Sequence, residues 1–138
     1  MQIEGKNGVI FNAQVQQKNN EYDVKIQAPN GETMGRIAFV VNKGTTFILH
    51  VSTEEKFQHQ GVGQALIDIC EYISALQRSF HIEGYYFPTN EYAQLFYQKN
   101  NYIIEKDSYN SYVYKIIDAD KTRQRLKNKI VKEDSLSV

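Results

Sequence analysis

Gln58-His59-Gln60-Gly61-Val62-Gly63 decides the fold, because the hydrophobic pattern of the chain changes at this stretch. Residues 45–53 before it read as a strand. After it, apolar side chains recur at three- and four-residue spacing, at Val62, Ala65, Leu66, Ile69, Ile73 and Leu76. That spacing is typical of an amphipathic helix of about four to five turns. The sequence therefore predicts a strand that leads through two glycines directly into a helix.

Such a junction is suited to binding a phosphate group. Unpaired backbone N–H groups and the positive end of the helix dipole meet at one point, and Gly61 and Gly63 allow a ligand to approach the backbone closely. A tight turn without a ligand is the alternative, since two spaced glycines are weak evidence alone. A P-loop is excluded because no Gly-Lys-Ser/Thr follows, and Leu66 stands where a dinucleotide fingerprint has its third glycine.

Three turn sequences divide the first half of the chain into four strands. They are Asn19-Asn20, Pro29-Asn30-Gly31 and Asn42-Lys43-Gly44. Residues of these types favour the positive φ angles that hairpin turns require. The strands between them, at residues 9–16, 21–27, 34–41 and 45–53, predict an antiparallel meander. In the fourth strand, the two-residue period places Phe47, Leu49, Val51 and Thr53 on one side.

The second half mixes strands and helices. After a strand at residues 82–87, Pro88-Thr89-Asn90-Glu91 caps a helix that runs to about Lys99. Strands are expected at residues 102–106 and 111–117, and a helical tail from about Asp120. The predicted fold is α+β: a mixed, mostly antiparallel sheet of about seven strands, two main helices and a C-terminal helical tail. Residues 1–118 form the domain, and residues 119–138 form the basic tail.

The composition is that of a single globular domain. Of the 138 residues, 41% are hydrophobic and 23% are charged. The 16 basic and 16 acidic side chains balance, which argues against a dedicated nucleic-acid binder. Cys70 is the single cysteine, so a disulfide within the chain is excluded and a cytoplasmic location is favoured. The sequence lacks a signal peptide and an apolar run long enough for a membrane span, so neither secretion nor membrane insertion is expected.

The glycine stretch resembles the acyl-CoA loop of the GNAT superfamily of N-acetyltransferases, whose signature is Gln or Arg, two residues, Gly, one residue, then Gly or Ala. Gln58, Gly61 and Gly63 match it. A second segment resembles the family's later helix, which usually reads Asn, Ala, an apolar residue, Tyr, then Lys-x-Gly-Phe. Its matching residues are Asn90, Ala93, Phe96, Tyr97, Lys99 and Tyr102. The resemblance spans roughly residues 34–116, and two motifs in this order are more specific than either alone.

This resemblance implies a site for acetyl-CoA, or another acyl-CoA, as co-substrate and no metal. In the family, the pantetheine arm of CoA lies between two splayed parallel strands. The implied cofactor-binding residues are Val51, Thr53, Gln58, His59, Gln60, Gly61, Val62, Gly63, Gln64 and Asn90. Tyr97 is implied to protonate the departing thiolate, which a phenol within hydrogen-bond reach can do. The alternatives are a core aromatic for Tyr97 and a helix cap, compatible with binding, for Asn90.

The acceptor side departs from the family pattern. Members usually have two helices between the first two strands, whereas only residues 17–20 separate them here. Some members carry a glutamate base on the fourth strand, where this chain has Phe47. His50 and Glu83 are the candidate bases, Glu83 is also a candidate anchor for the acceptor amine, and structural roles are the alternative for both. Because the acceptor wall is missing, the tail or a second subunit is expected to cover that side of the cleft.

The remaining reactive side chains are interpreted as structural. Cys70 lies at the edge of the apolar stripe of the first helix and has no Cys/His partner pattern. The three histidines lack the spacing of a metal site. The tail carries six basic side chains within 12 residues, which form either a solvated helix face or a surface for RNA or an acidic protein. They are Lys121, Arg123, Arg125, Lys127, Lys129 and Lys132.

The sequence thus predicts an acyl-CoA-dependent N-acyltransferase that transfers acetyl from acetyl-CoA to the primary amine of a small molecule or peptide by direct attack. One alternative is a module that binds acyl-CoA without turnover, suggested by the missing helices and the missing glutamate. Another is acylation of an RNA-linked or protein amine with the help of the basic tail. The apolar tail residues Leu126, Ile130 and Val131 are suited to dock the tail either on the sheet or on another subunit, and the second alternative would form a homodimer.

Overall fold

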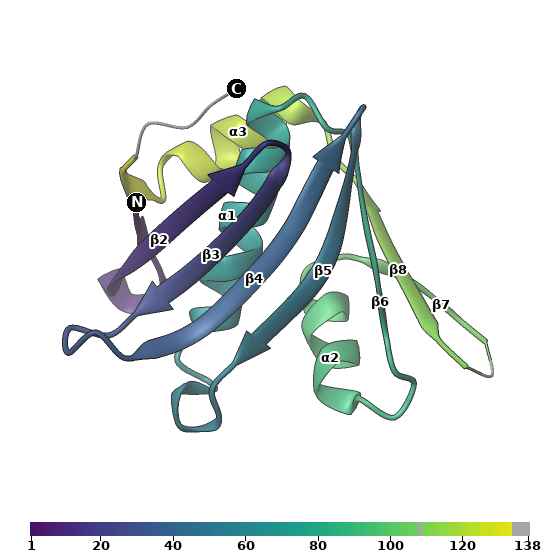
Figure 1. The fold of residues 1–138 in the computed structure, drawn as a ribbon, viewed down its shortest axis with the longest axis horizontal. Helices are drawn as coiled ribbons and strands as arrows, with labels where there is room; N and C mark the ends of the chain where they lie inside the picture. The colour runs from purple at the N-terminus through teal and green to yellow at the C-terminus, as the bar shows by residue number, and fades with distance from the viewer. Residues whose placement is uncertain (108, 134–138) are drawn as a thin grey trace.

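The computed structural model describes residues 1–107 and 109–133. Within these residues, nine strands form one sheet in the order β7-β8-β6-β5-β4-β3-β2-β1-β9 (Figure 1). The strands are β1 (Gln2–Glu4), β2 (Ile10–Lys18), β3 (Glu21–Gln27), β4 (Thr33–Asn42), β5 (Thr45–Thr53), β6 (His81–Tyr86), β7 (Ile103–Lys106), β8 (Ser111–Ile116) and β9 (Ile130–Lys132). The helices are α1 (Val62–Leu76), α2 (Glu91–Lys99) and α3 (Ala119–Lys127), with 3-10 turns at Lys6–Gly8 and Glu55–Phe57.

The predicted fold class and the predicted meander are confirmed. β2, β3, β4 and β5 pair antiparallel in chain order, and a 15-residue helix follows the glycine stretch. The predicted number of strands is too low, because the three-residue strands β1 and β9 were not expected. They pair antiparallel with each other, and a strand of this length carries too little periodicity to be recognised locally.

β5 and β6 pair in parallel over a short seam and then diverge. The seam joins Thr45–Ile48 to His81–Gly84. In Figure 1, α2 is visible between the two strands on one side of this seam. Beyond the seam, the facing edges of both strands keep backbone N–H and C=O groups that no neighbouring strand uses. We call this opening the splay; it is flanked by residues 49–53 and 85–86.

A β-bulge sits where the splay begins. His50 pairs with Ala38 and Ile48 pairs with Phe39, so Leu49 is the extra residue on β5. A bulge shifts the side-chain alternation by one position. The prediction that Phe47, Leu49, Val51 and Thr53 share one side is therefore wrong. Val51 packs toward the buried core, whereas Phe47 pairs with Val40 on the opposite face.

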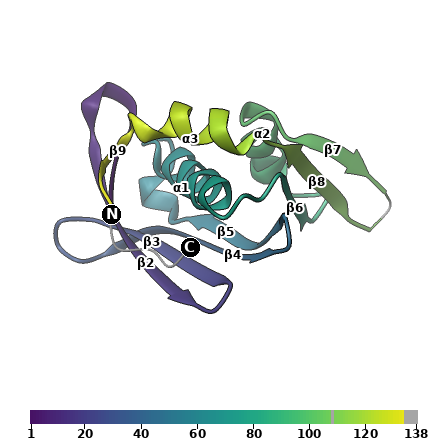
Figure 2. The ribbon, with the colours of Figure 1, turned by 90° about the horizontal axis from the view of Figure 1, so that it is seen from above.

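All three helices cover one face of the sheet (Figure 2). α1 packs against β1, β3, β4 and β5, and Gly35 permits its close approach to β4. A Cβ at Gly35 would lie 2.7 Å from Val62 Cγ1 and 2.9 Å from the Ser52 carbonyl oxygen. No described helix covers the other face, which we call the open face. It carries Asp23, Ala38, His50, Glu83 and Tyr112.

The tail lies over α1 and away from the open face. α3 contacts α1, Leu126 is fully buried, and β9 adds a strand beside β1. Figure 2 shows α3 and α1 on the same side of the sheet. For the described residues, the prediction that the tail closes the acceptor side of the cleft is therefore wrong, and cover by a second subunit stays a prediction. None of the helices within residues 1–107 and 109–133 is long and apolar enough to cross a membrane.

Two buried carboxylates on α1 explain the position of the tail. The Glu71 side chain, 2% exposed, accepts hydrogen bonds from Lys115 Nζ and Arg125 Nη2, both at 3.0 Å. It also accepts one from Tyr102 Oη at 3.1 Å. Asp68 accepts a hydrogen bond from Lys129 Nζ at 3.0 Å. Buried carboxylates need such partners, so Arg125 and Lys129 of the basic tail point inward.

We expect Glu71→Gln to lower the free energy of unfolding by about 2–3 kcal/mol, because it leaves Lys115 and Arg125 near a buried site without their counter-charge. The neighbouring cations are partly exposed, which keeps the cost below that of a fully buried pair. The control is Asp120→Asn, which removes an exposed ion pair with Arg78 and should change stability by under about 1 kcal/mol. Urea unfolding compares them. Equal stability of the two variants would contradict a role of Glu71 in holding the tail.

Candidate functional site

The glycine stretch forms a left-handed turn at the start of α1. Gly61 is the N-cap residue with φ +90°, a conformation that favours glycine. No side chain caps the helix, and the Ala65 N–H donates to the Gly61 carbonyl oxygen at 3.0 Å. The first N–H groups of α1 therefore remain available for an anionic ligand.

Three adjoining cavities form a continuous trough between β5 and α2, which we call the donor trough. The first, of about 400 Å³, lies beside Gly61, Gly63 and Phe96. The second, of about 180 Å³, shares Gly63 and Phe96 with the first and continues along Val51 to Asn90. The third, of about 320 Å³, shares Val51 and Asn90 with the second and reaches into the splay. The trough thus joins the start of α1 to the gap in the sheet.

Nearly all the predicted cofactor-binding residues line this trough. They are Val51, Thr53, Gln58, His59, Gly61, Val62, Gly63, Gln64 and Asn90. Gln60 does not: its Nε2 donates to the Lys56 carbonyl oxygen at 3.3 Å, and it lines a hollow beside Phe11 that adjoins the first cavity at Lys6 and His59. Asn90 caps α2 by accepting a hydrogen bond from Ala93 N at 3.0 Å. Its side-chain amide N–H groups can still donate to a ligand.

The wide end of the trough is positively charged, which the sequence did not reveal. Lys6, from the turn before β2, and Lys99, at the end of α2, both line the first cavity, and its lining contains no carboxylate. The Lys6 ammonium lowers the pKa of Lys99, and partial burial adds to this shift. Neither lysine has an acidic partner within 4.0 Å among the described residues. Lys6 is 55 positions before Gly61, so no local motif could indicate their proximity.

Tyr97 lies on the wall of the splay. Its side chain is 2% exposed and lines the third cavity. The ring stacks on that of Tyr86, with centroids 5.9 Å apart, and packs edge-on against that of Tyr102, with centroids 5.3 Å apart. Burial, with smaller contributions from Cys70 and Tyr86, raises the pKa of Tyr97. The phenol is therefore protonated at neutral pH and can donate a proton. Core packing and this chemical role are compatible.

Tyr86 is a second phenol at the splay, and the sequence analysis missed it. Its side chain is 8% exposed and lines the same cavity as Tyr97. The hydroxyl is buried and has no hydrogen-bond partner among the described residues. An orphaned buried hydroxyl carries a desolvation cost, so a ligand in the splay would supply the missing partner. Its strand context, between Tyr85 and Phe87, gives no local signal for such a role.

The bulge brings His50 to the mouth of the splay on the open face. His50 pairs with Ala38, which in turn pairs with Asp23. His50 is exposed, its Nε2 lies 3.0 Å from Ser52 Oγ, and it lines the third cavity together with Leu49 and Tyr85. An imidazole here can accept a proton from a group that enters the splay from the open face.

Glu83 also lies on the open face but does not line the donor trough. It pairs with Phe47 across the seam and accepts a hydrogen bond from Tyr112 Oη at 2.5 Å. Its Oε2 lies 3.5 Å from His81 Nε2. Burial, followed by the hydrogen bond to Glu83, raises the pKa of Tyr112. The structure therefore separates the two candidate bases, with His50 at the splay and Glu83 farther along the sheet.

Cys70 is fully buried on α1. Burial, followed by the charge of Glu71, raises the pKa of its thiol well above the ordinary value, which disfavours the reactive thiolate. Within the described part of the chain, no cluster of three or more His, Cys, Asp or Glu side chains is arranged to hold a metal ion.

Solved structures share this fold. The N-acetyltransferase PaiA from Thermoplasma acidophilum in complex with coenzyme A is 18% identical, with a TM-score of 0.67 over 71% of this chain and 62% of that one. The Campylobacter jejuni N-acetyltransferase PseH in complex with acetyl coenzyme A is 23% identical, with a TM-score of 0.61 over 74% and 72%. The Vibrio cholerae spermidine N-acetyltransferase in complex with CoA and spermine is 13% identical, with a TM-score of 0.61 over 71% and 66%.

No curated protein sequence matches the chain. The model of the acetyltransferase (GNAT) domain matches residues 21–104, which include both the glycine stretch and α2. This match covers more than half of the sequence, and the structural similarities agree with it in fold. The chain therefore belongs to the GNAT family of acetyltransferases.

Proposed function

We propose that the protein is an acyl-CoA-dependent N-acyltransferase that transfers acetyl from acetyl-CoA to a primary amine by direct attack. The donor trough carries this proposal, because its length joins a phosphate-binding helix start to a gap in the sheet. An extended ligand with phosphates at one end and a thioester at the other fits that arrangement.

The proposed donor complex uses the two ends of the trough differently. The pyrophosphate lies at the N–H groups of residues 59–64, near the ammonium groups of Lys6 and Lys99. The pantetheine arm runs along the unpaired edge of β5, with backbone groups of Val51 and Thr53 and the amide of Asn90 as partners. The thioester then lies in the splay, beside Tyr86 and Tyr97.

The proposed reaction forms one C–N bond and breaks one C–S bond. The neutral amine enters from the open face and attacks the thioester carbon, and backbone N–H groups near the bulge polarise the carbonyl. The amine gives up a proton to His50, the base that lines the splay. Tyr97 donates its proton to the departing thiolate of CoA, as its protonated state allows. Similarity in fold to an enzyme whose structure contains spermine supports a small-molecule amine as acceptor.

We expect His50→Gln to lower acetyl transfer by about 10²- to 10⁴-fold at neutral pH and to leave CoA affinity unchanged, because the imidazole lies on the acceptor side of the splay. Ser52→Ala is the matched control, since it removes the hydroxyl beside His50 and keeps the base. Thiol release measures transfer and isothermal titration measures CoA binding.

Equal transfer rates in His50→Gln and the unaltered protein would reject His50 as the base. CoA binding without thiol release across a panel of amines would instead favour the alternative function, a module that binds acyl-CoA without turnover. The absent acceptor helices and Phe47 in place of a glutamate are the observations behind that alternative.

A further inference from the structure

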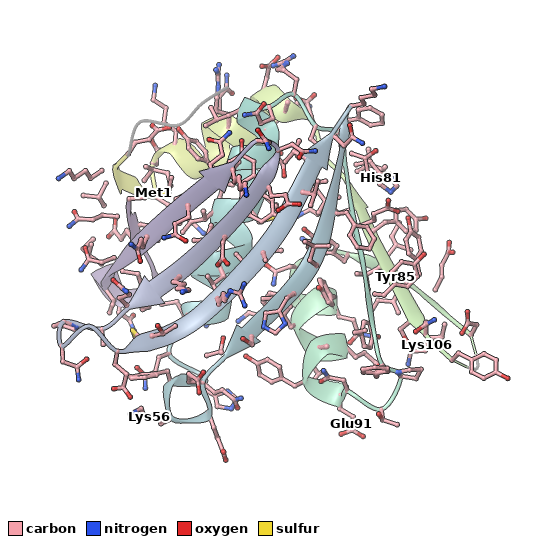
Figure 3. All side chains as sticks on the ribbon, in the orientation of Figure 1. Met1, Lys56, His81, Tyr85, Glu91 and Lys106 are labelled. Atoms are coloured by element: carbon pink, nitrogen blue, oxygen red, sulfur yellow. The ribbon has the colours of Figure 1, made fainter. Side chains whose placement is uncertain are left out.

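The open face of β6, β7 and β8 combines carboxylates with aromatic rings in an unusual way. Cross-strand pairing places Ile103, Tyr114 and Glu83 in one row and Glu105, Tyr112 and Tyr85 in the next. The side chains of this face include two carboxylates and the ring of His81 but no Lys or Arg. Figure 3 views the sheet from this side, with the labelled His81 and Tyr85 along β6.

The rings form a contiguous array around Glu83. Tyr112 lies between Tyr85 and Tyr114, with ring centroids 5.2 Å and 5.6 Å away respectively. His81 stacks on Tyr114 at 5.7 Å. Faces of aromatic rings and a carboxylate both attract organic cations, and the attraction grows when the site is partly desolvated. The Glu83 side chain is 27% exposed and has no Lys or Arg partner among the described residues.

The array continues directly into the splay. Tyr85 belongs both to the array and to the lining of the third cavity, which also contains the buried, unpartnered hydroxyl of Tyr86. Glu83 and Tyr85 are two residues apart on β6, a separation of about 7 Å along a strand. Glu83 is therefore too far from the splay to take a proton directly from an amine that reacts there.

We propose that the acceptor carries a second, cationic amine, which Glu83 and the surrounding tyrosines bind while the first amine reacts in the splay. This inference rests on the proposed acetyl transfer. The two amines must be separated by about 7 Å, the distance from Glu83 to the splay. With bonds of about 1.5 Å, a chain of roughly four or five methylene groups spans this distance. The reacting nitrogen is neutral when it attacks and gives its proton to the base at the splay. The distal nitrogen keeps its proton and remains an ammonium group throughout.

The test compares diamines with monoamines of the same length. We expect kcat/KM for 1,4-diaminobutane and 1,5-diaminopentane to exceed that for butylamine and pentylamine by at least tenfold, mainly through KM. Glu83→Gln should abolish this preference and leave the rate with monoamines within twofold. Tyr112→Phe, which keeps the ring and removes the hydrogen bond to Glu83, should alter the preference less. Glu21→Gln, an exposed site on β3, is the control for charge alone.

Two results would overturn the proposal. One is an equal preference for diamines and monoamines in the unaltered protein. The other is an equal loss with both amine classes in Glu83→Gln, which would give Glu83 a catalytic or structural role instead. Calorimetric titration of diamines into the CoA-loaded protein provides a readout that needs no turnover. Glu83-dependent diamine binding without thiol release would support the cation site while rejecting acetyl transfer, and no diamine binding would reject the cation site itself.

Discussion

Tyr97→Phe is expected to lower turnover by about 10²- to 10⁴-fold, because it removes the proton that the departing thiolate takes up. Affinity for CoA should stay the same, since the hydroxyl acts in the transition state and the ring keeps its contacts with Tyr86 and Tyr102. Burial raises the pKa of Tyr97, so the phenol stays protonated above its ordinary titration range. Turnover of the unaltered protein should therefore show no alkaline loss from Tyr97 below about pH 10.

Steady-state kinetics with acetyl-CoA measures this effect. Tyr92→Phe is the matched control, because Tyr92 lies on the same helix and lines the trough at its other end. Thermal unfolding should show only a small change in either variant. If Tyr97→Phe turns over as fast as the unaltered protein, Tyr97 is a packing residue and the thiolate takes its proton from Tyr86 or from water.

Gly63→Val is expected to weaken CoA binding at least tenfold, which corresponds to about 1.4 kcal/mol. A Cβ at this position would lie 3.2 Å from Phe96 Cε1 and 3.7 Å from Thr53 Oγ1. Both of those residues line the trough, so the added side chain projects into the space between α1 and α2. Gly63→Ala should have a smaller effect in the same direction, because it adds only the first carbon.

Gln60→Ala is the control for Gly63→Val. It lies in the same loop, but its side chain points away from the trough to the Lys56 carbonyl, so CoA affinity should be unchanged. Isothermal titration with CoA compares the variants, and circular dichroism verifies that each is folded. Full affinity in a folded Gly63→Val protein would place the phosphates elsewhere and remove the main support for an acyl-CoA site.

The local features of the donor side could be predicted from the sequence. The change from two-residue to helical periodicity at Gly61 is a property of adjacent residues, and so is the cap at Asn90. The structure accordingly has α1 beginning at Val62 and Asn90 capping α2. The fold of residues 10–99 follows largely from such signals.

The acceptor side could not be predicted in the same way. The bulge at Leu49 depends on the register of β4 as well as β5. Because of this one extra residue, Phe47 lies on the opposite side of the sheet from Val51 instead of on the same side. The tail was misplaced because its position depends on Glu71 and Asp68, whose partners in the tail, Arg125 and Lys129, lie 54 and 61 residues away in the sequence. Burial of those carboxylates emerges only when the whole sheet has formed.

The short seam between β5 and β6 has a mechanical consequence for the molecule. Four residue pairs between β5 and β6 join the three strands β7, β8 and β6 to the six strands that continue from β5, so the two parts of the sheet are connected only along this short edge. The pantetheine arm of CoA in the splay would take the place of a strand between β5 and β6. It would form hydrogen bonds with the unpaired backbone groups on the facing edges of both strands. The ligand would then be a structural member of the sheet, and folding stability would rise with its concentration by mass action.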